Sequence, residues 1–253
     1  MNKIAFITGA TSGIGEACAM KFADYNFNII ITGRRKDKLE FLAGTIRKKY
    51  NVEVLPLCFD VRDRTAVKKN VKELPKEWKS IDVLINNAGL ASGLNPIQEG
   101  LYDDWDKMID TNVKGLLYMT RYIVPLMIAN AKGHIINIGS IAGREAYTNG
   151  NVYCGTKAAV DSITRGMRMD LLQYGIRVSL VEPGAVETEF SEVRFKGDKE
   201  KAKNVYKGYQ PLTGEDVADV VYFVSSVPSH VNISDVLVVP TAQASVSMLH
   251  KKL

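Results

Sequence analysis

Short apolar runs rich in β-branched residues alternate along this chain with longer segments of helical period. The apolar runs cover residues 4–8, 28–32, 54–59, 81–85, 134–139, 176–182 and 235–239, and the helical segments cover residues 13–25, the stretch ending at 47, 66–74, 105–130, 152–174 and 217–227. Continuous apolar strands separated by helices are typical of a parallel sheet that helices cover on both faces. Because crossovers between parallel strands are right-handed, such units build a doubly wound sheet whose ligands bind at the carboxyl ends of the strands. We therefore predict an α/β fold with a mostly parallel, seven-stranded sheet.

The composition argues against several classes of protein. No repeat, low-complexity block or Pro- or Ser-rich linker divides the 253 residues, so we expect one domain over residues 1–253. Lysine and arginine total 33 against 28 acidic residues, and the two signs are interspersed along the chain. A nucleic-acid-binding protein would cluster its basic residues, so we expect no nucleic-acid partner.

The cysteines and the longest apolar runs bear on compartment and metal binding. The three cysteines have neither metal-ligand nor CxxC spacing, which predicts reduced thiols and no metal site. No apolar run approaches the ~18 residues that a membrane span needs. We therefore expect a cytoplasmic protein with no membrane association.

The first predicted strand runs into a glycine-rich turn, Thr-Gly-Ala-Thr-Ser-Gly-Ile-Gly, at residues 8–15. Glycines there let the backbone turn tightly and approach a pyrophosphate, which then lies at a helix N-terminus where free N–H groups favour anions. Turns also collect glycine for purely conformational reasons. The position between the first strand and the first helix nevertheless indicates a dinucleotide-binding, Rossmann-type domain. The cofactor contacts predicted from this turn are Gly9, Thr11, Ser12, Gly13, Ile14 and Gly15.

The end of the second strand predicts which dinucleotide binds. NAD-type sites carry an acidic side chain about 20 residues beyond the glycines, where it accepts from the ribose 2′-hydroxyl. Here the strand ends in Thr-Gly-Arg-Arg, with Arg34 and Arg35 in place of a carboxylate. Two guanidinium groups suit a 2′-phosphate. A pair of exposed arginines opening a helix would give the same sequence, but we predict NADP (NADPH) as the cofactor.

Polar residues follow the third and fourth strands at the same predicted edge of the sheet. Asp60 and Val61 follow one strand, and Asn87, Ala88 and Gly89 follow the next. Each group could be a turn that only satisfies local backbone groups. Their common position favours contacts with the adenosine half of the cofactor.

Tyr153 and Lys157 lie four residues apart in a predicted helix and so share one face. A free tyrosine has a pKa of about 10 and is a poor proton shuttle at neutral pH. A nearby ammonium and an oxidised nicotinamide would stabilise its phenolate. Ser140, just after the fifth strand, could hydrogen-bond a substrate oxygen. Asn112 is an amide at an otherwise core-like helix position, where a helix bend or a satisfied buried amide is the simpler explanation.

These residues resemble the short-chain dehydrogenases/reductases, and the resemblance covers essentially the whole chain. It is carried by the glycine-rich turn, the Asn-Asn-Ala-Gly stretch at residues 86–89, and the order Asn112, Ser140, Tyr153 and Lys157. The resemblance implies Tyr153 as general acid/base, Ser140 as the group that polarises the substrate, Lys157 as a ribose ligand that lowers the phenol pKa, and Asn112 as the holder of a relay water. It also implies that Pro183, Gly184, Val186 and Thr188 border the nicotinamide.

A narrower likeness is to the NADP-dependent 3-hydroxy acid dehydrogenases, also called serine or L-allo-threonine dehydrogenases. It is strongest at residues 32–35, 89–91, 109–112 and 189–198. The likeness implies interconversion of short 3-hydroxy acids with their 3-oxo acids or semialdehydes, with substrates of the serine, L-allo-threonine, 3-hydroxyisobutyrate or 3-hydroxypropionate type. It also implies a substrate lid at about residues 187–212, a C-terminal tail at 240–253 and a homotetramer.

A carboxylate substrate needs a cationic partner, and three residues near the strand-edge loops are candidates: Arg144, Arg194 and Lys196. Each could equally face water. A 3-oxoacyl-carrier-protein reductase, or another carbonyl reductase, would share the four catalytic residues, although the charged segment 194–207 suits a small acid better than a long thioester. A non-catalytic NADP sensor on the same fold would have no need of the proton-relay residues.

Overall fold

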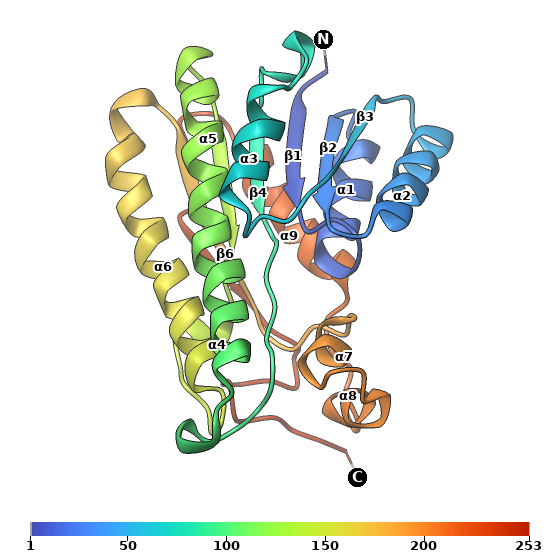
Figure 1. The fold of residues 1–253 in the computed structure, drawn as a ribbon, viewed down its shortest axis with the longest axis vertical. Helices are drawn as coiled ribbons and strands as arrows, with labels where there is room; N and C mark the ends of the chain where they lie inside the picture. The colour runs from blue at the N-terminus through green and yellow to red at the C-terminus, as the bar shows by residue number, and fades with distance from the viewer. Residues whose placement is uncertain (1, 253) are drawn as a thin grey trace.

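The computed structural model describes residues 2–252 as a seven-stranded sheet with helices on both faces (Figure 1). The strands are β1 (Ile4–Thr8), β2 (Asn28–Gly33), β3 (Val54–Cys58), β4 (Val83–Asn86), β5 (His134–Ile138), β6 (Arg177–Pro183) and β7 (Asp235–Val238). They lie in the order β3-β2-β1-β4-β5-β6-β7, and each neighbouring pair is parallel. The predicted doubly wound α/β fold is confirmed, and the sheet is parallel throughout.

Two helical layers cover this sheet. The helices are α1 (Gly13–Asp24), α2 (Lys36–Lys49), α3 (Arg64–Lys72), α4 (Tyr102–Ile109), α5 (Leu116–Ala129), α6 (Asn151–Leu171), α7 (Phe190–Arg194), α8 (Lys199–Val205) and α9 (Gly214–Ser226). Helices α1, α2 and α9 cover one face, and α3, α5 and α6 cover the other (Figure 1). Within residues 2–252 no helix combines the length and apolar character needed to cross a membrane.

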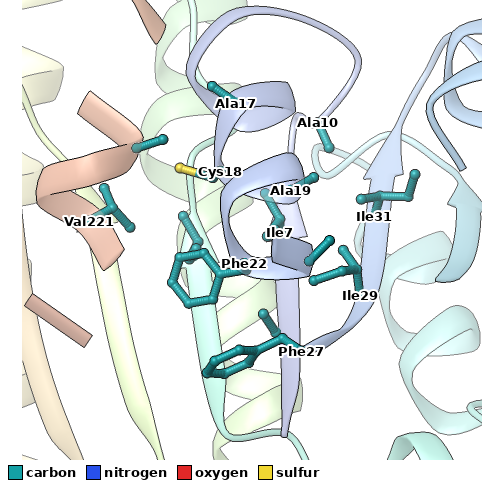
Figure 2. Close-up of a cluster of buried hydrophobic side chains, with 14 of the residues drawn as sticks. Ile7, Ala10, Ala17, Cys18, Ala19, Phe22, Phe27, Ile29, Ile31 and Val221 are labelled. Atoms are coloured by element: carbon teal, nitrogen blue, oxygen red, sulfur yellow. The ribbon is translucent and has the colours of Figure 1, made fainter. Parts of the chain in front are cut away.

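The strand side chains alternate between two buried clusters, as the period of two requires. In β1, Ala5 and Ile7 join the cluster beneath α1, α2 and α9, while Ile4 and Phe6 join the cluster beneath α3 and α5. Figure 2 shows part of the first cluster, with Phe22 of α1 directed toward the sheet. A sheet buried on both faces explains why the strands are apolar throughout in the sequence.

The strand order reverses between β1 and β4. The chain moves outward from β1 to β3 and then returns to the other side of β1 with β4. The loops that follow β1 and β4 therefore leave the sheet side by side and diverge to opposite faces. Such a switch point is where doubly wound sheets open a ligand-binding crevice.

Several element boundaries differ from the sequence-based predictions. The helix predicted over 105–130 begins at Tyr102 and is divided by a π-helical turn at Asp110–Gly115. Helices α3 and α9 start earlier than predicted because side chains cap them. Asp63 accepts from two backbone N–H groups at the start of α3, and Thr213 forms a capping box with Asp216. Helices α7 and α8 were not predicted, because they have only five and seven residues and give no clear helical period.

Phe22→Ala should lower the free energy of unfolding by about 3–5 kcal/mol, the usual cost of truncating a buried aromatic residue. Phe22 is fully buried and contacts the rings of Phe27 and Tyr222 edge-on, at centroid distances of 5.1 and 5.5 Å. Phe41→Ala makes the same chemical change on α2, where the side chain is 74% exposed, and should cost within about 0.5 kcal/mol. Denaturant titration of both variants measures the difference, and equal losses would contradict this account of the core.

Candidate active site

A cavity of about 490 Å³ opens at the carboxyl edge of the sheet, over the switch point. One end lies at Arg34 and Arg35 after β2, and the other end lies at Tyr147, Val246 and Leu249. The predicted residues that line it are Gly9, Thr11, Ser12, Gly13, Ile14, Arg34, Arg35, Asp60, Val61, Asn87, Ala88, Gly89, Ser140, Tyr153, Lys157, Pro183, Gly184, Val186, Thr188 and Arg194. The structure thus brings the predicted cofactor and catalytic residues, except Gly15 and Asn112, around one space.

The glycine-rich turn brings the loops after β1 and β4 into contact. Gly9 has a left-handed φ of +66°, and a Cβ there would lie 2.8 Å from the Cα of Ala88. Gly15 does not line the cavity, but a Cβ there would collide with the Gly9 carbonyl and the Asn87 amide. The Asn87 amide nitrogen donates to the carbonyls of Thr8 and Gly9, at 2.9 and 3.1 Å. Gly15 therefore shapes the turn through packing, since α1 approaches the two loops closely.

The two arginines after β2 have different environments. Arg35 donates to the hydroxyls of Thr11 and Ser12, both at 2.8 Å, and to Glu189 at 2.6 Å. Arg34 has a side chain that is 57% exposed and lies 3.9 Å from Asp60. Asp60 is held more closely by Arg62, at 2.7 Å. Arg34 is consequently the arginine whose guanidinium is available to an anion, whereas Arg35 is already bonded on three sides.

Tyr153 and Lys157 extend from the first turns of α6 into the cavity, and both are almost completely buried. Burial raises the pKa of the Tyr153 phenol, and the hydrogen bond with Ser140 opposes that effect. Burial lowers the pKa of Lys157 to about 8. The Lys157 ammonium donates to the Ile138 carbonyl at 2.9 Å, which fixes it beside the end of β5. The arrangement places a phenol, a hydroxyl and a titratable amine at one end of the cavity.

Asn112 lies in the π-helical turn and does not line the cavity. Its amide oxygen accepts from the backbone N–H of Leu90 at 2.8 Å, and its amide nitrogen donates to the Leu90 carbonyl and to Thr156. Thr156 in turn donates to the Tyr153 carbonyl at 2.7 Å. The Asn112 side chain is therefore a satisfied buried amide that ties the loop after β4 to α6. Single π-helical turns occur most often at functional sites.

The three candidate cations for a substrate carboxylate differ in their partners and in whether they line the cavity. Arg144 pairs with Glu182, its Nε donating at 2.7 Å, and Lys196 pairs with Asp104 at 2.9 Å. Neither lines the cavity, so both lie outside the space that most of the predicted site residues surround. Arg194 does line it, and its guanidinium carbon lies 5.6 Å from the centre of the Tyr153 ring.

The polar contacts of Arg194 are with neutral groups in the described part of the chain. It donates to the Tyr147 hydroxyl at 2.6 Å and to the Gly93 carbonyl at 3.4 Å. Tyr147, Phe190, Thr111 and Gln243 also line the cavity and were not predicted from the sequence. No spacing or motif marks them, because only the fold brings together the loop, the helical turns and the tail that carry them.

Residues 187–212 form an excursion from the sheet whose two ends lie next to each other. Val186 pairs with Leu212, and Leu212 donates to the Ala185 carbonyl at 2.9 Å. Between these ends the chain forms α7 and α8 (Figure 1). Residues of both helices line the cavity. The excursion therefore has a fixed base, set directly after Pro183 and Gly184.

The C-terminal segment runs along the same side. The amide oxygen of Gln243 accepts from the Ala185 N–H at 2.9 Å, and Lys252 donates to the Gly208 carbonyl at 2.7 Å. Val246 and Leu249 line the cavity between these two attachments. The last residue of the predicted tail, Leu253, lies outside the described residues. The tail thus joins the excursion to the loop that follows β6.

Comparison with known proteins shows the family to which this chain belongs. A model of the short chain dehydrogenase family matches residues 3–199. The chain belongs to the short-chain dehydrogenases. No group of three or more His, Cys, Asp or Glu residues that could hold a metal ion occurs among residues 2–252 of this short-chain dehydrogenase.

Several proteins are similar over almost their whole length. The NADP-dependent 3-hydroxy acid dehydrogenase of Salmonella typhi is 46% identical over 242 residues, which are 95% of this chain and 96% of that protein. The enzyme of the same name from Schizosaccharomyces pombe is 45% identical over 251 residues, 99% of this chain and 97% of that one. The closed form of a serine dehydrogenase complexed with NADP+ is 44% identical, with a TM-score of 0.91 over 99% of this chain and 100% of that one.

Arg144→Ala in this short-chain dehydrogenase should lower the free energy of unfolding by about 3 kcal/mol, because it leaves a buried carboxylate without its counter-charge. The Glu182 side chain is only 2% exposed. Adding Glu182→Gln to Arg144→Ala should recover part of the loss. Arg165→Ala is the control, since its partner pair with Asp161 is at the surface and should contribute at most about 1 kcal/mol. Equal denaturation midpoints for the two single variants would contradict the argument.

Proposed function

We propose that this chain is an NADP-dependent oxidoreductase that interconverts short 3-hydroxy acids with their 3-oxo acids or semialdehydes. Substrates of the serine, L-allo-threonine, 3-hydroxyisobutyrate or 3-hydroxypropionate type are those we expect. The observation that carries the proposal is Arg194, an arginine with neutral partners set against the ring of Tyr153. The names of the similar proteins support both the cofactor and the substrate class.

The residues that line the cavity suit a dinucleotide. The turn at Gly9 and Gly13 would hold the pyrophosphate at the N-terminus of α1, where N–H groups are free to bind anions. Arg34 would bind the 2′-phosphate, with Asp60 and Val61 beside the adenine. Thr111 supports the fit, because it lines the cavity and its buried hydroxyl has no hydrogen-bond partner within residues 2–252. When bound, NADP supplies the hydride acceptor, and NADPH the hydride donor.

Tyr153 would be the general acid and base. In the oxidation it accepts the proton of the substrate hydroxyl, and in the reduction it returns a proton to the carbonyl oxygen. Burial favours the neutral phenol, so a cation is needed to stabilise the phenolate. Lys157, one turn further along α6, would supply that charge and bind the nicotinamide ribose. Its pKa of about 8 leaves most of the amine protonated at neutral pH.

Ser140 and Arg194 would hold the two polar ends of a substrate. The Ser140 oxygen accepts from the Ala142 N–H at 3.1 Å, which orients its hydroxyl for donation to the substrate oxygen. Arg194 would bind the carboxylate, since a guanidinium matches a carboxylate in a two-point contact. Asn112 would act through its side-chain bonds, which hold the loop after β4 against α6. The relay water that the family resemblance implies for it stays a prediction.

We further propose that residues 1–253 act as one cofactor-binding domain, with 187–212 as a substrate lid and 240–253 as a tail that covers the cavity. Residues 187–212 lie beside the cavity from a fixed base, which supports the role of a lid. We retain the predicted homotetramer. Exposed apolar side chains on the helical layers support assembly, among them Leu117 of α5, Met169 of α6 and Phe223 of α9.

The first test is absorbance at the reduced-nicotinamide band with NADP or NAD, over L-serine, L-allo-threonine, 3-hydroxyisobutyrate, 3-hydroxypropionate and matched neutral alcohols. We expect turnover of the acids with NADP. Tyr153→Phe should lower kcat by at least about 100-fold, because general acid–base catalysis contributes 10²–10⁴-fold. Turnover of a 3-oxoacyl thioester but of no free acid would instead indicate a carrier-protein reductase. NADPH binding without any turnover would indicate a sensor.

Arg194→Gln should raise KM for the acids by at least about tenfold and change kcat/KM for neutral alcohols by less than about threefold, because only the acids lose a charge-assisted contact. Lys196→Gln is the matched control, since its ammonium pairs with Asp104 outside the cavity. Substrate-saturation curves for both variants measure the effect. Equal losses for acids and alcohols would remove Arg194 from the role of carboxylate ligand.

A further inference from the structure

Helix α7 lines the cavity and has a charged residue at each of its ends. It has only five residues, Phe190–Arg194, and Glu189 is its N-terminal cap. Glu189 lies at the end where Arg35 borders the cavity, and Arg194 lies at the end occupied by Tyr153. One short rigid element therefore touches both the proposed phosphate end and the proposed substrate end.

The Glu189 carboxylate joins the N-terminal end of α7 to the segment after β2 and to α2. One oxygen lies 2.6 Å from Arg35, and the other lies 2.5 Å from Lys38 in the first turn of α2. Arg35 is itself fixed by the hydroxyls of Thr11 and Ser12. Burial alone would raise the pKa of Glu189, but the bonds from Lys38 and Arg35 outweigh it and lower the pKa to about 2. The carboxylate is thus ionised and held from both sides.

Both ends of α7 pack on the Tyr153 ring, through Phe190 at the start of the helix and Arg194 at its end. The Phe190 ring meets the Tyr153 ring at a centroid distance of 5.6 Å, and the Arg194 guanidinium lies at 5.6 Å from the same ring. The Gly93 N–H donates to the Arg194 carbonyl at 3.0 Å, which adds a backbone contact at the C-terminal end. A shift of α7 along its axis would therefore move Arg194 relative to Tyr153.

We propose that Glu189 is a positioning residue: by binding Arg35 and Lys38 it fixes α7 so that Arg194 meets the substrate carboxylate at the right distance from Tyr153. This inference rests on the proposed function of Arg194. Glu189 does not touch the substrate end itself, so it acts only through the helix that it caps.

The negative charge of Glu189 should also weaken binding of the cofactor phosphate. Glu189 is a negative charge in contact with two cations at the end of the cavity where Arg34 would receive a 2′-phosphate. Removing it would make the local potential more positive and favour a phosphate. Loss of Glu189 should therefore weaken the binding of the acid substrate. It should leave the binding of NADP unchanged or strengthen it.

The test compares Glu189→Ala with Glu192→Ala, which removes an exposed carboxylate from the same helix. For Glu189→Ala we expect KM for the acids to rise by about fivefold or more, the size of one ordered ion-pair network. The Kd of NADPH, measured by nucleotide fluorescence, should stay equal or fall. Glu192→Ala should change neither quantity. Glu189→Gln keeps an acceptor for Arg35, so it should give an intermediate KM, and thermal unfolding verifies that each variant is folded.

Two results would overturn the inference. One is an acid KM that Glu189→Ala leaves unchanged. The other is a parallel rise of the acid KM, the NADPH Kd and the KM for neutral alcohols, which indicates general damage to the site. If the unaltered protein oxidises neutral alcohols but no acid, the proposed function fails, and this result is distinct from a failure of the Glu189 coupling.

Discussion

The close approach of two backbone segments at the reversal of strand order is the constraint on which the rest of the structure depends. Gly9 lies against Ala88 with no space for a side chain. The amide of Asn87, which follows β4, donates to the carbonyls of Thr8 and Gly9 at the end of β1. This contact fixes where the loops after β1 and β4 diverge. Every polar group of the cavity is then placed relative to that point, because each comes from the carboxyl end of a strand or from a helix that follows one.

Buried polar contacts hold the cavity walls together on the side of Tyr153. Asn112 joins the loop after β4 to α6, and the Glu182–Arg144 pair joins the end of β6 to the loop that carries Ser140. A buried carboxylate or amide is tolerated only when its bonding capacity is satisfied. These groups therefore favour one relative placement of three loops, and the proton transfer proposed for Tyr153 requires such a placement.

The fold was predictable because strand runs and helix periods reflect burial on both faces of a sheet. The residues at the carboxyl edge were predictable as a group for the same reason, since strand ends share one edge. Arg144 and Lys196 lie outside the cavity, because sequence position shows nearness to the edge but not the presence of Glu182 or Asp104 as partners. Tyr147 and Gln243 could not be found, since long-range packing alone brings them to the cavity. The π-helical turn at Asn112 leaves no mark in a helical period.

The excursion between Val186 and Leu212 has ends that are paired with each other. A loop closed at its base can change in length at small entropic cost, because closure entropy grows only slowly with the number of residues. Its helices can also be replaced without altering the pairing of any strand. The segment proposed to face the substrate thus takes no part in the strand pairing of the sheet. A scaffold of this kind can acquire a new substrate by exchanging about two dozen residues, while the nucleotide half keeps its sequence.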